Sequence, residues 1–177
     1  LLTGRWPVRS GVYRREPPET GARSGPGVFR VDSERGLPHD EITVAEMLKA
    51  RGYATAMVGK WHLGHRPEYA PDRHGFDSFF GLPYSNDMGL APGVKGGREM
   101  MREPRPEYWT VPLLRDGVVV EQPVEQTTLT KRYTEEAVRV IRSNRDRPFF
   151  LYLAHSMPHV PLFRSPAFAG RSAAGIY

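Results

Sequence analysis

The sequence contains no cysteine, which excludes disulfide bonds and thiolate metal sites. It has no apolar run near 18 residues and no signal peptide, so no membrane span or export signal is predicted within it. The Gly-x-Ser-x-Gly elbow, the P-loop, the Rossmann fingerprint and His-Glu-x-x-His are also missing. These absences exclude the usual active sites of serine hydrolases, nucleotide enzymes and zinc peptidases.

The composition is that of a globular domain with many loops. Hydrophobic residues make up 39% of the chain, enough for a core, whereas 18 Gly and 17 Pro divide it into short elements. The net charge of +5 comes from scattered arginines, without any zinc-finger, RNP or helix-turn-helix pattern. We therefore expect no nucleic-acid partner.

Two amphipathic helices are predicted. Thr43 and Glu46 form a capping box before a helix over residues 44–51, and Gly52 supplies its stop. The buried face of this helix is expected to carry Val44, Met47 and Leu48. The second helix is expected to end near residue 144, with a buried face of Leu129, Tyr133, Ala137, Val140 and Ile141.

Each helix is followed by an apolar run that predicts a buried strand. The first covers residues 53–58 and ends at Gly59. The second, residues 149–153, is continuous in apolar character, as is typical of a strand covered on both faces. Two helix-to-strand units in one chain favour an α/β sheet.

The remaining segments predict loops and one hairpin. Residues 11–38 are rich in Gly, Pro, Arg and Glu and indicate a long surface loop, and residues 64–97 indicate loops with at most one helical turn. Asp116-Gly117 lies between the apolar runs 111–114 and 118–120, a strong signal for a β-hairpin.

Polar residues follow both predicted strands, at the edge where open α/β sheets hold their ligands. Lys60 and His62 are two residues apart, so an extended exit from the strand would place both side chains on one side and let Trp61 pack away. A fixed ammonium and an imidazole aimed at one point suit a small oxyanion. A surface lysine and a histidine bonded to a backbone carbonyl would explain the same residues.

His159 is a second candidate, because it lies in a proline-restrained loop where an imidazole could act as a general acid. It could also be a loop histidine without a task. His155 is expected to bond locally, and Ser85 to stabilise a turn. Asp87 has no second carboxylate at a convincing spacing, so we assign no metal site to this chain.

Several segments, taken together, resemble the sulfatase family, closest to its arylsulfatase A-like members. The most specific is residues 52–62, Gly-Tyr-Ala-Thr-Ala-Met-Val-Gly-Lys-Trp-His, which resembles the second family signature without departure. The others follow in the family's order: Leu-Leu-Thr-Gly-Arg at 1–5, residues 74–81, 83–87, and 148–152 ahead of His159 and Pro161.

The resemblance implies an alkaline-phosphatase-like mixed sheet flanked by helices, of which residues 1–177 would be an incomplete part of the N-terminal catalytic domain. Leu1 is not an initiator methionine and the chain opens within a motif, so we expect an interior fragment. The formylglycine residue, calcium ligands and a second sulfate-binding lysine would lie outside it. The fragment alone is therefore expected to be inactive.

The resemblance also assigns roles to residues of this chain. Lys60 would bind sulfate and support the formylglycine, and His62 would hydrogen-bond its hydroxyl. His159 would hold the sulfate ester and protonate the leaving oxygen, while Ser85 would line the pocket. The implied substrate is a sulfated small molecule or glycan, and the implied partner is a formylglycine-generating system. Export to the periplasm, the outside or the lysosome follows from the family alone.

Two other functions stay open at this point. A phosphomonoesterase or phosphodiesterase of the same superfamily would use a similar cationic pocket, and would be favoured by Thr in place of the signature Cys or Ser. A non-catalytic anion-binding module could keep the fold after losing the nucleophile.

Overall fold

A five-stranded mixed sheet forms the centre of the computed structural model, which describes residues 1–12 and 28–176. The strands run in the order β4-β3-β2-β1-β5. Strand β1 is parallel to β2 and β5, and β3 and β4 continue the sheet antiparallel from β2. The strands are β1 (Ala54–Lys60), β2 (Ser78–Leu82), β3 (Leu113–Arg115), β4 (Val118–Glu121) and β5 (Phe149–Ala154). The α/β prediction is confirmed.

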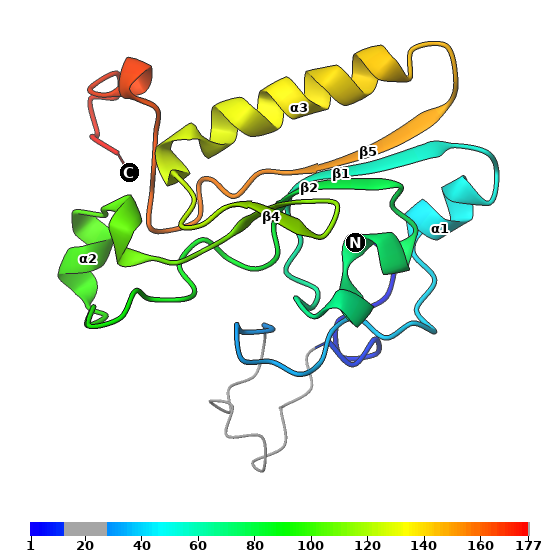
Figure 1. Ribbon diagram of the computed structural model, residues 1–177, viewed down its shortest axis with the longest axis horizontal. Coiled ribbons are helices and arrows are strands. Elements are labelled where there is room, and N and C mark those ends of the chain that lie inside the picture. Colours follow the sequence, from blue (N-terminus) through cyan, green and yellow to red (C-terminus); the bar gives the residue numbers. More distant parts are fainter. Residues whose placement is uncertain (13–27, 177) are drawn as a thin grey trace.

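Helices lie on both sides of this sheet (Figure 1). The longest, α3, lies along one face, and the N-terminal segment and two short turns lie on the other. The helices are α1 (Val44–Lys49), α2 (Arg98–Arg102) and α3 (Leu129–Ser143), and the 3-10 turns are η2 (Pro67–Tyr69), η3 (Pro71–His74), η4 (Pro106–Tyr108), η5 (Gln126–Thr128) and η6 (Pro166–Phe168). Within the described ranges, no helix has the length and apolarity needed to cross a bilayer.

Alternation along the strands divides the core into two clusters. Val58 of β1 and Phe80 of β2 pack with Tyr133 of α3. Their sequence neighbours Met57 and Phe79 point to the opposite face and pack with Trp61 and Phe76. This period of two is what a pleated strand imposes when both of its faces are covered.

Helix α1 begins as predicted, and of the three residues expected on its buried face only Met47 is exposed. Its capping box is present, with Thr43 Oγ1 accepting from Glu46 N at 3.1 Å and Glu46 Oε2 accepting from Thr43 N at 2.8 Å. Ala45 is the buried side chain of the helix, whereas Met47 is 62% exposed. The predicted burial of Met47 is wrong, because the side of the helix that packs on the core is that of Val44 and Ala45, and Met47 points away from it.

Helix α3 matches its predicted range, with Asn144 as its C-terminal cap. Leu129, Tyr133 and Val140 are buried, but Ile141 is 45% exposed, so the predicted apolar face is correct except at its last residue. Because α3 contacts β5, β1 and β2, this helix anchors the parallel half of the sheet.

Strand β2 corrects the prediction of loops over residues 64–97. It is short, its fourth residue is Gly81, and two proline-led turns, η2 and η3, come just before it. These breaks hide the strand signal in the sequence. The strand prediction for 53–58 is confirmed, although β1 continues through Gly59 to Lys60.

The hairpin is confirmed as β3 and β4, joined by Asp116 and Gly117 with φ of 49° and 82°. Positive φ at both central residues is the conformation that Asp-Gly favours in two-residue hairpins. The expectation that both faces of β5 are buried is wrong within the described residues. Strand β5 is an edge strand, and its side chains are mostly half-buried. The predicted long loop carries no helix or strand over 28–38, and its part at 13–27 lies outside the described residues.

Candidate functional site

The carboxyl ends of β2, β1 and β5 come very close together. Gly59 is paired in register with Gly81 of β2 and with Ala154 of β5. A Cβ on Gly59 would lie 1.9 Å from the Ala154 carbonyl oxygen, and a Cβ on Gly81 would lie 1.7 Å from the Gly59 carbonyl oxygen. Only glycine fits at either position, and Gly59 also has a φ of 114° that disfavours other residues. Lys60 follows at the end of β1.

The chain leaving β1 is not extended, which corrects the predicted geometry. The backbone N–H groups of Trp61 and His62 donate to the carbonyls of Leu82 and Pro83 at 2.9 and 3.1 Å. His62 has a φ of 59°, an uncommon conformation for a residue other than glycine. Strained backbone of this kind is found most often where a side chain must be aimed. The prediction that Trp61 packs away is confirmed, since it is 4% exposed and contacts Phe76.

A backbone carbonyl fixes the ring of His62. Its Nε2 lies 3.0 Å from the Phe29 carbonyl oxygen, which can only accept, so Nε2 carries the hydrogen. Burial lowers the pKa of His62, and the charge of Lys60 lowers it further. The neutral ring is therefore favoured, and Nδ1 keeps a lone pair that can accept a proton or a hydrogen bond.

Lys60 shares this environment with an acidic side chain. Burial lowers the pKa of the Lys60 ammonium, and the carboxylate of Asp87 opposes that shift. Asp87 and His159 also act electrostatically on His62. The structure thus brings Lys60, His62, Asp87 and His159 into one neighbourhood, although they come from three segments of the sequence.

His159 is exposed and lies over the buried Ser85. Its Nδ1 lies 2.6 Å from the Val160 carbonyl oxygen and 3.5 Å from Ser85 Oγ. Because a carbonyl oxygen can only accept, Nδ1 carries a hydrogen, and Nε2 is the ring nitrogen that remains available to another partner. Ser85 is fully buried, and its carbonyl accepts from Met88 N at 3.1 Å, so the expected turn is present together with the contact to His159.

Sequence reasoning missed Asn86 and Gln126. Both are buried, and two side-chain hydrogen bonds join them across 40 residues of sequence. A polar pair so far apart leaves no local pattern. The only available signal was the position of Asn86 between Ser85 and Asp87.

His155 lies apart from these residues, and Asp87 is not assigned to a metal. His155 is exposed and lies against the ring of Tyr133, with centroids 6.0 Å apart. In the described part of the chain, no three His, Asp or Glu side chains gather in an arrangement that could hold a metal ion. One carboxylate oxygen of Asp87 is buried without a hydrogen-bond partner among these residues.

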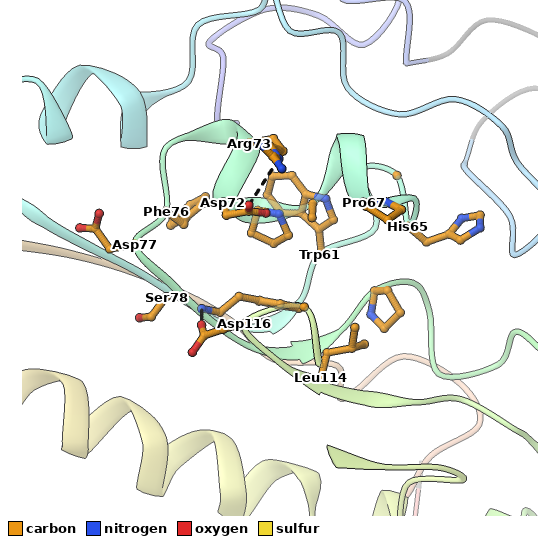
Figure 2. Close-up of a pocket in the computed structure, with 16 residues that line it drawn as sticks. Trp61, His65, Pro67, Asp72, Arg73, Phe76, Asp77, Ser78, Leu114 and Asp116 are labelled. Atoms are coloured by element: carbon orange, nitrogen blue, oxygen red, sulfur yellow. Dashed lines mark hydrogen bonds and ion pairs between the residues drawn. The ribbon is translucent and has the colours of Figure 1, made fainter. Parts of the chain in front are cut away.

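A pocket of about 400 Å³ is lined by Trp61, the residue between Lys60 and His62. It is bounded by Trp61 and Phe76 on one side and by Leu114 and Asp116 on the other (Figure 2). Lys60, His62, Ser85 and His159 do not line it. The candidate site is therefore the surface at the strand ends and not this pocket.

Comparison with known proteins shows the family of this chain. The sulfatase family model matches residues 1–175. Arylsulfatase G from Mus musculus is 40% identical over 194 residues, covering 100% of this chain and 34% of the relative. Arylsulfatase A from Homo sapiens is 40% identical over 188 residues, covering 99% of this chain and 34% of the relative.

A solved sulfatase structure has a similar fold. The crystal structure of the sulfatase PsFucS1 from Pseudoalteromonas sp. has 26% sequence identity and a TM-score of 0.65, covering 98% of this chain and 36% of that one. This chain thus spans about a third of the length of the relatives that it matches. With the family model matched over nearly its whole length, the chain belongs to the sulfatase family.

Proposed function

We propose that the full-length protein containing this chain hydrolyses sulfate monoesters, and that residues 1–177 supply one side of its sulfate pocket as part of the N-terminal catalytic domain. The observation that carries the proposal is the grouping of Lys60, His62 and His159 at the carboxyl ends of β1 and β5. The Lys60 ammonium and the His159 imidazole can donate to a tetrahedral anion, and the neutral ring of His62 beside them can accept a proton.

Lys60 is proposed to bind the sulfate oxygens and to support the formylglycine. Because Lys60 is partly buried, its ammonium attracts an anion more strongly than an ammonium surrounded by water would. Asp87 favours the protonated form and so keeps that charge in place. Lys60 is therefore expected to act in binding of both substrate and transition state.

His62 is proposed to accept a proton at Nδ1 from the formylglycine hydroxyl. The bond from Nε2 to the Phe29 carbonyl orients the ring and prevents the other tautomer. Burial and the nearby Lys60 charge keep the ring neutral, which is the state a proton acceptor needs. This chain thus prepares the base before substrate arrives.

His159 is proposed to hold the sulfate ester and, as an imidazolium with a hydrogen on both ring nitrogens, to give its Nε2 proton to the leaving oxygen and become the neutral ring. The Val160 carbonyl holds Nδ1, which leaves Nε2 for the substrate. Ser85 lies against the same ring and would line the pocket. A general acid matters most for esters whose leaving group is a poor one.

Formylglycine would supply the nucleophilic hydroxyl, and a divalent cation, calcium by family resemblance, would supply Lewis-acid stabilisation of the sulfate oxygens. By resemblance to the family, the ligands of this cation are proposed to lie outside residues 1–177, in other parts of the full-length protein. Asp87 contributes a single carboxylate close to Lys60 and is not assigned to the metal.

Modification by a formylglycine-generating system, export from the cytoplasm and action on a sulfated small molecule or glycan are further parts of the proposal. All three rest on membership of the family. Mass spectrometry of the signature residue upstream of Leu1 would check the first directly: Cys or Ser converted to formylglycine supports the proposal, and an unmodified Thr would contradict it.

The activity is tested with the full-length protein, 4-nitrophenyl sulfate and 4-nitrophenyl phosphate. We expect a kcat/KM for the sulfate at least tenfold above that for the phosphate, and a loss of about 10²-fold or more in Lys60→Ala and His159→Ala. Arg51→Ala, an exposed cation at the opposite end of β1, is the matched control and should change little. Preference for phosphate would favour the phosphatase reading, and tight sulfate binding without turnover would favour an anion-binding module.

A further inference from the structure

A buried amide network joins three segments around the candidate site. The Asn86 side-chain nitrogen donates to Gln126 Oε1 and to the Pro161 carbonyl, each at 3.1 Å. Gln126 Nε2 donates in return to the Asn86 carbonyl, also at 3.1 Å. Asn86 is 0% exposed and Gln126 is 2% exposed, so water does not compete for these bonds.

Each end of this network lies next to a proposed substrate contact. Asn86 stands between Ser85, which touches the ring of His159, and Asp87, which acts on Lys60. Pro161 is two residues beyond His159 along the chain. Gln126 belongs to η5, the turn that leads directly into α3. The network therefore fixes both site loops relative to the helix that anchors the sheet.

Stability alone does not explain these residues. Asn86 Oδ1 is buried and has no hydrogen-bond partner among the described residues, although the same amide donates twice. An unpaired buried acceptor is unfavourable, and apolar side chains of similar shape would stabilise a core as well as a partly satisfied polar pair does. A specific geometry is the better explanation for an amide pair at this place.

We propose that Gln126 is a positioning residue of the sulfate pocket, which holds the loop of Ser85 and Asp87 against the loop of His159. The proposal rests on the function proposed above. Gln126 acts through Asn86 and Pro161 and does not touch the substrate. Because Ser85 Oγ and His159 Nδ1 are 3.5 Å apart, at the outer limit of a hydrogen bond, a small shift of either loop would separate them.

The test uses Gln126→Met in the full-length protein, since Met keeps the length of the side chain and removes both hydrogen-bonding atoms. Gln126→Glu is the second variant, because it keeps the oxygen that accepts from Asn86. Val140→Ala is the stability control: Val140 is a buried residue of α3 near the end that precedes β5, away from the strand ends that carry the site. All are assayed well below their unfolding temperatures with 4-nitrophenyl sulfate and with phenyl sulfate, whose leaving group is poorer.

We expect Gln126→Met to lower kcat/KM about tenfold to 10²-fold, with the larger loss on phenyl sulfate, because misplacement of His159 weakens proton donation to the leaving oxygen. Val140→Ala should lower Tm and leave both kcat/KM values and their ratio unchanged. A Gln126→Met protein that loses Tm but keeps wild-type kinetics on both esters would overturn the proposal. Unfolding of both Gln126 variants would overturn it as well, since it would assign the residue to folding.

Binding of inorganic sulfate, measured by calorimetry on the same samples, separates this inference from the proposed function. If the wild type binds sulfate without hydrolysing either ester, the function fails, and weaker sulfate binding in Gln126→Met but not in Val140→Ala would still support positioning. If Gln126→Met binds sulfate as the wild type does and no ester is hydrolysed, both proposals fall.

Discussion

The ring of His62 donates its Nε2 hydrogen to the carbonyl of Phe29, 33 residues earlier in the chain, at 3.0 Å. This bond selects one tautomer and aims Nδ1 away from Phe29. The ring makes this bond from a residue with left-handed backbone, at a φ of 59°. The loop before the first helix therefore orients an imidazole at the end of β1.

The first prediction concerns this ring. In His62→Gln the side-chain amide can still donate to the Phe29 carbonyl, but it provides no basic nitrogen. We expect kcat to fall by about 10²-fold to 10⁴-fold, with KM changed much less, because a proton acceptor acts in the chemical step. Steady-state kinetics of the full-length protein on 4-nitrophenyl sulfate measures both values. Wild-type kcat in this variant would remove His62 from the proposed mechanism.

The second prediction compares two glycines with positive φ. Gly59 has a φ of 114° and no room for a Cβ, whereas Gly52 has a φ of 82° with nothing within 4 Å of a Cβ. Gly52→Ala should cost about 1 kcal/mol from backbone conformation alone. Gly59→Ala should abolish folding or lower Tm far more, since its Cβ would overlap the Ala154 carbonyl. Thermal unfolding of both variants checks this, and equal Tm losses would contradict the close packing of the strand ends.

The third prediction concerns acid pH. Burial lowers the pKa values of His62, His65 and His74 in the folded protein. Between the lowered values and about 6.5, the unfolded chain binds protons that the folded protein does not, so stability falls as pH decreases through this range. Tm measured from pH 7 to pH 5 should therefore decrease.

The contribution of His74 to this pH dependence can be measured separately. It is 1% exposed, stacks on His39 with centroids 5.4 Å apart, and has no hydrogen-bond partner for either ring nitrogen among the described residues. His74→Phe should keep the stack and reduce the fall of Tm between pH 7 and pH 5. The exposed His155, replaced by Gln, is the control. An unchanged pH dependence in His74→Phe would show that His74 does not contribute.

The fourth prediction concerns the contact between the hairpin and α3. Both oxygens of Glu136 accept from Arg115, at 2.8 and 3.0 Å, and Arg139 bonds the same carboxylate. Glu136 is 8% exposed, and although burial opposes it, pairing with the two arginines lowers its pKa to about 2. Glu136→Gln should destabilise the protein by about 1.5 kcal/mol, because it removes the charge that strengthens the hydrogen bonds from two partly exposed arginines.

The adjacent Glu135 supplies the matched control for this prediction. It forms an exposed pair with Lys131 at 3.7 Å, so Glu135→Gln should cost less than about 0.5 kcal/mol. Chemical unfolding of the two variants, side by side, measures the difference. Similar losses in both would show that the buried carboxylate does not hold the hairpin against α3.

Much of the fold could be predicted because its signals are local. The capping box at Thr43, the apolar repeat of α3 and the Asp116-Gly117 turn each depend on residues only a few positions apart. Strand β2 was missed because Gly81 and the preceding turns interrupt its pattern, and the expected cover of β5 was wrong because apolar character does not show what lies on each face.

The candidate site was predicted in part for a related reason. Lys60 and His159 could be chosen because each follows an apolar strand, and parallel strand ends meet at one edge of a sheet. The bonds of His62 to Phe29 and of Asn86 to Gln126 connect residues 33 and 40 positions apart, and no sequence pattern marks such pairs. The orientation of these side chains depends on long-range bonds, so the geometry of the candidate site could not be predicted from the sequence.

A crystal structure of the full-length protein with inorganic sulfate bound tests the central claim most directly. The account predicts the anion at the carboxyl ends of β1 and β5, within hydrogen-bond distance of Lys60 Nζ and His159 Nε2, with His62 close by. Sulfate bound at another place, with those three side chains facing no common space, would contradict it.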